Sequence, residues 1–284
     1  MQQYDYIVIG AGSAGCVVAE RLSQDPNTSV LLLEAGGKNN SGLLSIPLAA
    51  AAVLNKPAFS WCYNTEPEPY LNNRSINWPR GKVLGGSSSI NGMIYIRGQR
   101  QDYDGWAAQG NQGWSFDELL PYFIRNEKNS RGASSHHGDN GPQWVGDIAH
   151  EFEMSDRFIA AAEAAGIPVN NDFNGPQQEG VGYFQAMIKD GRRQSSATDF
   201  LHLCKKRKNF TLITKAMTNQ ILIENGVAIG VSYSRGKQTL IAKCSKEVLL
   251  TAGAINSPQL LELSGIGDRD RLQALGVELH HHLP

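Results

Sequence analysis

The sequence predicts an α/β fold with a mainly parallel sheet, and the first 34 residues carry this prediction. Residues 6–9 form a short apolar run rich in β-branched side chains, typical of a parallel strand covered on both faces. A glycine-rich turn follows, and a helix is expected from about residue 13 to residue 23. A second strand is expected over residues 29–33. Strand, helix and strand in this order favour a parallel pair, because the helix returns the chain to its starting edge.

The glycine spacing indicates a dinucleotide-binding, Rossmann-like turn. Gly10 permits the tight turn, Gly12 lets a pyrophosphate approach the backbone, and Gly15 lets the helix pack close to the strand. The free N–H groups at the start of this helix, at Ser13 and Ala14, would point at the phosphates. A purely structural turn is the alternative, since glycine occurs wherever a strand meets a helix.

An acidic residue ends the second expected strand. Glu34 lies nineteen positions after Gly15, where a carboxylate can accept hydrogen bonds from an adenosine ribose, and Ala35 follows it as a further candidate contact. A carboxylate at this position disfavours a 2′-phosphate and therefore NADP. This stretch alone does not separate NAD from FAD.

Composition places the chain among ordinary globular proteins. Its 284 residues are 41% hydrophobic and 19% charged, with a formal net charge of −1, enough for one large domain or two modest ones. No basic block indicates nucleic acid as a partner, and no apolar run suits a membrane span, although peripheral membrane association stays open. The four cysteines are far apart, so neither a zinc site nor a disulfide framework is indicated, and Cys16 is expected to be a small buried hydrophobe. Reduced thiols, and a strand that begins near Met1 without space for a signal peptide, favour a cytoplasmic location.

A second loop rich in glycine and hydroxyl groups covers residues 85–89. Its backbone N–H groups and serine hydroxyls could serve a phosphate or a polar ring edge. A serine-rich surface turn is the alternative, but it explains neither the small residues that follow nor the apolar run over residues 93–96.

The rest of the chain reads as alternating helices and strands. Helices are expected over residues 48–54, 117–126 with Ser115 as N-cap, 153–165 with Gly166 as the stop, 197–206, and 254–265 after a Ser257–Pro258 start. Strands are expected over residues 209–214, 220–224, 227–233 and 247–250, with a hairpin turn at Asn225–Gly226. Residues 61–71 should be extended or irregular because of two prolines.

Two groups of histidines could suggest a metal, and no metal site is predicted from either. His136 and His137 are adjacent, so they should point apart in a loop or strand, and a surface pair is expected. Residues 280–282 are three histidines, which are expected to form a strand end.

Two long stretches carry a family resemblance. Residues 78–98 resemble the first signature of the glucose-methanol-choline (GMC) oxidoreductases, FAD-dependent enzymes that act on alcohols, and residues 250–267 resemble the second. The similarity is collinear over the whole chain and is greatest to the branch of choline and aliphatic-alcohol dehydrogenases. The resemblance implies FAD rather than NAD.

The resemblance also implies further cofactor-binding residues. Contacts to the cofactor are expected from Arg80, Val83, Gly86 and Ser87, with Asn91, Gly92, Met93 and Ile94 near the isoalloxazine, backbone contacts to adenine at Thr218, and a close approach at Ala252 and Gly253. Some relatives attach the flavin covalently through a histidine that corresponds to Ile90, so FAD should be non-covalent here.

The implied domain organisation is a first FAD-binding part over residues 1–145, the start of an α+β substrate domain over 146–200, and a return to the FAD-binding domain over 201–284. In the family, the alcohol gives its proton to a histidine base and its hydride to flavin N5; that histidine is expected beyond residue 284, so no catalytic residue is assigned here. The electron acceptor stays open between oxygen and a quinone-like carrier, and the resemblance favours a carrier.

Three functional interpretations follow from these expectations. The first is the FAD-binding part of an alcohol or choline dehydrogenase. The second is a non-catalytic flavin-binding module or inactive remnant, and the third, an NAD-linked dehydrogenase, leaves the two signatures without a role. The 284-residue chain by itself is expected to fold poorly and to lack alcohol turnover, because exposed apolar surface favours aggregation.

Overall fold

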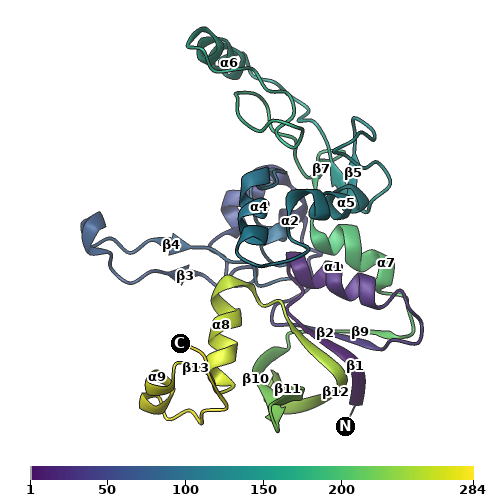
Figure 1. The fold of residues 1–284 in the computed structure, drawn as a ribbon, viewed down its shortest axis with the longest axis vertical. Helices are drawn as coiled ribbons and strands as arrows, with labels where there is room; N and C mark the ends of the chain where they lie inside the picture. The colour runs from purple at the N-terminus through teal and green to yellow at the C-terminus, as the bar shows by residue number, and fades with distance from the viewer. Residues whose placement is uncertain (1) are drawn as a thin grey trace. The chain divides into compact units, whose positions relative to one another are not determined.

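The computed structural model describes residues 2–284, which form two compact units (Figure 1). The first unit contains residues up to 44, 48–91 and 195–284, and the second contains residues 45–47 and 92–194. The chain thus leaves the first unit after Asn91 and returns to it at Ser195. The boundaries of the compact units therefore differ from the expected domain limits at residues 145 and 200.

A six-stranded sheet forms the centre of the first unit, in the order β10-β11-β12-β1-β2-β9. Its strands are β1 (Gln2–Ile9), β2 (Val30–Glu34), β9 (Phe210–Thr214), β10 (Met217–Glu224), β11 (Val227–Arg235) and β12 (Gln238–Leu250). The four strands β12, β1, β2 and β9 are parallel, whereas β10 and β11 extend the sheet antiparallel. The expected α/β fold with a mainly parallel sheet is confirmed.

Apolar side chains on both faces of β1 and β2 explain why these strands are continuously hydrophobic. Val8 and Leu32 pack on one face with α1 (Ser13–Leu22), whose Cys16 is fully buried, as expected. Ile7 and Leu31 pack on the other face with Leu260 of α8 (Gly253–Leu263). Burying each such Leu or Ile contributes about 1.5–3 kcal/mol, so this double-sided core fixes the ends of the strands where the glycine turn begins.

The hairpin of the antiparallel extension follows from its turn residues. Asn225 and Gly226 connect β10 to β11 with φ values of 51° and 77°, as a two-residue turn with positive φ at both positions requires. β12 is much longer than the expected strand over residues 247–250, because residues 238–243 pair with β11. This first half of β12 is largely exposed, and its apolar run covers only residues 240–242 between polar residues, so its sequence gives a weak strand signal.

Two helix predictions need correction in detail. Pro258 is the sixth residue of α8 rather than part of its first turn, and the helix begins at Gly253, whose φ is +88°. The expected helix over residues 197–206 is a π-helical turn (Ala197–Leu201) followed by α7 (His202–Cys204).

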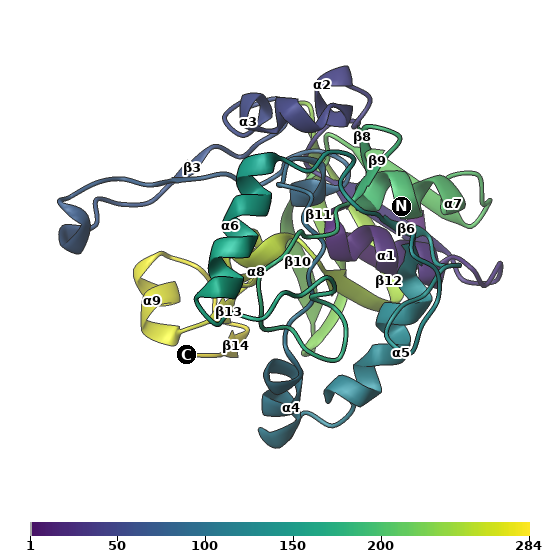
Figure 2. The same ribbon diagram turned by 90° about the horizontal axis from the view of Figure 1, so that it is seen from above.

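The remaining elements of the first unit are short, and the β3–β4 hairpin protrudes from it in both views (Figures 1 and 2). They are a 3₁₀ turn (Pro47–Ala49, whose Pro47 belongs to the second unit), α3 (Ala50–Val53), β3 (Tyr63–Asn64), a 3₁₀ turn (Pro69–Leu71), β4 (Asn77–Trp78), a 3₁₀ turn (Gly86–Ser89), β13 (Ile266–Gly267), α9 (Arg269–Ala274) and β14 (His281–His282); α2 (Gly42–Ser45) ends at the division between the units. β14 pairs with β13, so the expected strand end at the histidines is confirmed.

The second unit is built from short helices and two-stranded ladders. Its elements are α4 (Arg100–Ala108), α5 (Phe116–Asn126), β5 (Glu127–Asn129), β6 (Gln143–Val145), α6 (Glu153–Ala164), β7 (Ile188–Lys189) and β8 (Arg192–Arg193). Ser115 caps α5 in a capping box with Glu118, as its sequence position predicts. Across residues 2–284, none of the helices combines the length and apolar character that crossing a bilayer requires.

Candidate functional site

A cavity of about 520 Å³ lies in the first unit at the carboxyl ends of its parallel strands. β1, β2 and β12 each contribute the residues with which they end, including Ile9, Glu34 and Leu250. Its size lies within the range of pockets that hold small molecules and cofactors. Ligands of open α/β sheets bind at this edge, so this cavity is the candidate site.

Three glycine-containing loops converge on this cavity, although they are far apart in the sequence. A Cβ atom placed on Gly86 would lie 2.7 Å from the Cα atom of Gly12. A Cβ atom on Gly10 would lie 2.7 Å from the carbonyl oxygen of Thr251. Only glycine permits these close approaches of the backbone. They bring the stretches of residues 78–98 and 250–267 against the first glycine turn.

Two helices direct their N-termini to the same cavity. The first residues of α1, Ser13 and Ala14, and those of α8, Gly253 and Ala254, all line it. Neither helix has a side-chain cap or an acidic residue in its first turn. Their free N–H groups and dipoles therefore create a positive potential that favours an anionic ligand such as a diphosphate.

The Glu34 carboxyl group lies in the wall of the cavity and is 6% exposed. Its Oε2 accepts the Ala11 N–H at 2.9 Å, and its Oε1 accepts the Gly36 N–H at 2.7 Å. Burial raises the pKa of Glu34 to about 7, although these hydrogen bonds and Lys82 oppose the rise. Each carboxylate oxygen has a second lone pair, so the group can still accept a ligand hydroxyl.

Twelve of the expected site residues line the cavity. They are Gly10, Gly12, Ser13, Ala14, Glu34, Ala35, Arg80, Gly86, Ser87, Thr218, Ala252 and Gly253. Together they offer N–H donors, a carboxylate and small side chains, a combination that fits a ligand with a diphosphate and a ribose.

The other expected site residues lie elsewhere. Gly15 serves packing, because a Cβ atom there would lie 1.9 Å from the Gly10 carbonyl oxygen. Val83 is fully buried in a small core cluster, and Asn91 ends its segment of the first unit without lining the cavity. Gly92, Met93 and Ile94 belong to the second unit, where Met93 has a φ of +64°.

The sequence reasoning missed an aromatic wall of the cavity. Trp61 and Tyr63 stack with ring centroids 5.7 Å apart and 7° between their planes, and both line the cavity. The Tyr63 hydroxyl donates a hydrogen bond of 2.6 Å to Asn256 Oδ1 in α8. Cys62 between them has a φ of +54°, so the alternation of side chains along an extended strand does not bring the two rings together, and their spacing gave no signal of this wall.

The histidine pair of the second unit is not a surface pair. His136 is half-buried, whereas His137 is only 7% exposed, and the ring nitrogens of His137 contact Glu127 and Asp172. The sequence prediction is wrong for His137 because its carboxylate partners lie 10 and 35 residues away. Across the described residues 2–284, no group of three or more His, Cys, Asp or Glu side chains is arranged to hold a metal ion.

Comparison with known proteins relates this site to a family. The chain is 45% identical to the alcohol dehydrogenase [acceptor] of Pseudomonas putida, covering 99% of this chain and 51% of that protein. It is 43% identical to the human mitochondrial choline dehydrogenase, covering 99% of this chain and 49% of that protein. The chain thus spans about half the length of the curated relatives it matches.

Solved structures share the fold. Pyridoxine 4-oxidase from Mesorbium loti superposes with a TM-score of 0.95 at 33% identity, covering 99% of this chain and 55% of that chain. An FAD-dependent oxidoreductase from Chaetomium thermophilum gives a TM-score of 0.92 at 32% identity, covering 99% and 51%. The family model described as GMC oxidoreductase matches residues 4–284. The chain therefore belongs to the GMC oxidoreductase family and corresponds to its N-terminal region.

Proposed function

We propose that this chain is the FAD-binding part of an oxidoreductase that converts an alcohol, either choline or an aliphatic primary alcohol, to the aldehyde. The convergence of three glycine loops and two helix N-termini on one cavity carries this proposal. Such an arrangement suits the diphosphate of a dinucleotide better than any neutral ligand. The names of the relatives, an alcohol dehydrogenase and choline dehydrogenases, support alcohols as the substrate class.

Different residues of the cavity wall would contact different parts of the cofactor. The N–H groups at Ser13 and Ala14, with Gly86 across from them, would hold the diphosphate, and Glu34 would accept the ribose hydroxyls. The backbone at Thr218 would face the adenine. Ile90 is 2% exposed and stands where some relatives carry the histidine that bonds the flavin, so the cofactor is held non-covalently.

FAD, when bound, supplies the acceptor for the hydride that leaves the α-carbon of the alcohol. The hydroxyl proton requires a base, worth about 10²–10⁴ in rate, and the resemblance places the histidine that serves as this base beyond residue 284. The role of the present residues is to bind and orient the cofactor.

A chimeric protein tests this function. We would join residues 1–284 to the remaining half of the Pseudomonas putida alcohol dehydrogenase and follow dye reduction with choline and with aliphatic alcohols. The chimera is expected to carry one FAD, released by acid denaturation, and to reduce the dye only with an alcohol. The remaining half expressed alone is the control and should do neither.

The outcomes separate the competing interpretations. A chimera that binds FAD without any alcohol turnover would favour a non-catalytic flavin-binding module. Preference for NAD over FAD, or flavin that stays with the denatured protein, would contradict the proposed non-covalent FAD site.

Glu34 gives the site a pH dependence. Ribose hydroxyls donate to the ionised carboxylate, so binding should lower the pKa of Glu34 from about 7 and release a proton. The FAD affinity of the wild-type chimera is therefore expected to increase as the pH is raised from ~6 to ~8. Release of one proton limits this increase to about tenfold. Calorimetry in two buffers of different ionisation enthalpy measures the proton release. Glu34→Gln should bind more weakly and without this pH dependence, and an affinity that falls with pH would exclude this role.

A further inference from the structure

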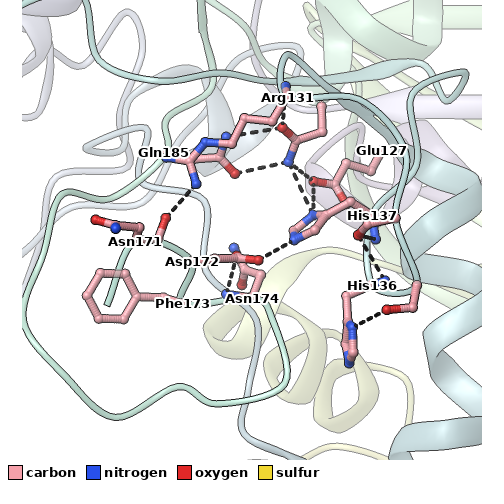
Figure 3. Close-up of polar contacts among 12 residues, drawn as sticks. Glu127, Arg131, His136, His137, Asn171, Asp172, Phe173, Asn174 and Gln185 are labelled. Carbon is pink, nitrogen blue, oxygen red and sulfur yellow. Dashed lines mark hydrogen bonds and ion pairs between the residues drawn. The ribbon is translucent and has the colours of Figure 1, made fainter. Parts of the chain in front are cut away.

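A buried histidine in the second unit lies between two carboxylates (Figure 3). His137 Nδ1 lies 2.9 Å from Glu127 Oε1, and His137 Nε2 lies 3.0 Å from Asp172 Oδ2. An ionised carboxylate only accepts hydrogen bonds, so each ring nitrogen has to carry a proton to satisfy its partner. Asn129 Nδ2 also lies 3.2 Å from His137 Nδ1, but its two hydrogens have nearer acceptors, Glu127 Oε1 at 2.7 Å and Gln185 Oε1 at 3.0 Å. The geometry therefore favours His137 as an imidazolium cation.

The charges around His137 balance only in this protonated form. Arg97, whose side chain is 4% exposed, forms an ion pair with the fully buried Glu127, and Arg131 pairs with Asp147 at 2.7 Å. The charged groups of this cluster are Arg97, Arg131 and His137 against Glu127, Asp147 and Asp172. Loss of the imidazolium proton would leave one uncompensated negative charge in the cluster and would remove one of the two cations that contact the fully buried Glu127.

Two other titratable residues, Tyr95 and His136, lie near this cluster. The Tyr95 ring lies 5.8 Å from the Arg97 guanidinium, and burial raises the pKa of Tyr95 above its usual value. His136 is half-buried and contacts the cluster through its carbonyl oxygen, which accepts Arg97 Nη1 at 2.8 Å.

The cluster holds the segment of residues 92–97. The Arg97 N–H donates to Asn174 Oδ1 at 2.8 Å, and Asn174 Nδ2 donates to the Tyr95 carbonyl oxygen at 3.2 Å. The Tyr95 N–H donates to the Gln185 carbonyl oxygen at 2.9 Å. Asn174 follows Asp172 closely in the chain, so the carboxylate that pairs with His137 and the amide that holds the segment are on one loop.

A strained residue in this segment needs such support. Met93 has a φ of +64°, a conformation that costs a non-glycine residue of order 1–3 kcal/mol unless its surroundings enforce it. The Met187 N–H donates to the Met93 carbonyl oxygen at 2.8 Å, and residue 94 forms a bridge with residue 186.

We propose that protonated His137 is a pH-sensitive lock, which fixes residues 92–97 in the second unit and releases them when the proton is lost. The imidazolium neutralises Glu127 and Asp172 together, so its proton couples α5 and β5 to the loop of Asp172–Asn174. This inference depends only on contacts within the second unit and does not rest on the flavin or on alcohol oxidation.

The pH range of the lock follows from the hydrogen bonds of His137. Hydrogen bonds to Asp172 and Glu127 raise the pKa of His137 to about 9, and the bond from His137 lowers the pKa of Asp172. A released histidine has a pKa of about 6.5. The stabilisation is therefore complete below a pH of about 6.5, decreases as the pH rises, and is lost once the pH passes about 9.

Hydrogen exchange of the chimera measures this release directly. The protection factors of the Tyr95 and Arg97 amides, corrected for the intrinsic effect of pH, are expected to fall by about tenfold per pH unit between ~6.5 and ~9 and then level off. Amides of β9 in the first unit serve as the internal reference and should show no such fall.

A pair of variants separates the lock from general charge effects. Asp172→Asn removes one carboxylate from His137 and so lowers the pKa of His137. The fall in the protection factors should therefore level off at a pH at least about one unit lower than in the wild type. Asp139→Asn removes the same charge from an exposed residue of the same unit, outside the cluster, and should behave like the wild type. His137→Gln should show low protection factors at every pH. The same variant lacks the imidazole ¹⁵N signals of His137, so comparison with the wild type assigns these signals.

The proposal would be overturned by any of three results. These are wild-type protection that does not change between pH ~6.5 and ~9, equal shifts in the two aspartate variants, or a neutral His137 imidazole at pH ~7 in the ¹⁵N spectrum. The wild-type and Asp172→Asn measurements keep the test decisive even if His137→Gln does not fold.

Discussion

Replacing Gly86 with alanine is expected to lower the affinity for FAD by at least about 100-fold, equivalent to roughly 2.7 kcal/mol. The added Cβ atom would lie 2.7 Å from the Gly12 Cα atom, closer than real Cβ contacts allow. The neighbour is backbone, so the two glycine loops would have to separate where the diphosphate is proposed to bind. Titration of the chimera with FAD, followed by flavin fluorescence, measures the loss.

Gly236 offers a matched control within the same unit. Its φ of +62° is close to the +53° of Gly86, but a Cβ atom there would meet nothing within 4 Å. Gly236→Ala therefore carries the same conformational cost without the contact, and FAD affinity should stay within a few fold of the wild type. Equal losses in both variants would show that backbone strain, rather than the approach of the two loops, determines the effect.

Replacing Glu127 with glutamine is expected to destabilise the second unit by about 3–5 kcal/mol, because it breaks a buried ion pair on one side. Glu127 is fully buried and contacts Arg97 and His137, and it accepts the Asn129 Nδ2 donor at 2.7 Å. The substitution keeps the shape but leaves Arg97 and His137 without their shared counter-charge. Urea unfolding followed by tryptophan fluorescence reports mainly on this unit, which contains Trp106, Trp114 and Trp144.

Glu153 provides the corresponding exposed pair. It contacts Arg157 at 2.6 Å, with side chains 80% and 71% exposed, so Glu153→Gln should cost less than about 1 kcal/mol. Similar losses of unfolding free energy in both variants would mean that burial of the Glu127 cluster contributes little. An intact Glu127→Gln protein would also remove the basis for the pH-sensitive lock.

Short-range patterns in the sequence predicted the elements whose determinants lie within a few residues. The apolar run before Gly10 predicted β1, the Asn225–Gly226 pair predicted the β10–β11 hairpin, and Ser115 predicted the start of α5, and all three are confirmed. Each depends on a local backbone preference or on side-chain periodicity, which the chain carries regardless of its partners.

Other predictions failed where partners from distant parts of the chain decide the structure. His137 was expected at the surface, but Glu127 and Asp172 bury it from both sides. Pro258 was expected at the start of a helix. The helix instead begins at Gly253, and its Leu260 packs in the core of the sheet. In neither case does the sequence next to His137 or Pro258 indicate which distant residues will pack against this part of the chain.

The sequence by itself determined the strand–glycine–helix turn, the position of Glu34 and the resemblance to an FAD-dependent family. Only the tertiary structure decided that Gly86 lies against Gly12, that Trp61 and Tyr63 form a wall of the cavity, and that a histidine lies between two carboxylates in the second unit. The physical reason is the range of the forces involved. Turn chemistry and periodicity act between neighbours in the chain, whereas close packing and charge compensation act between residues that meet only after the chain has folded.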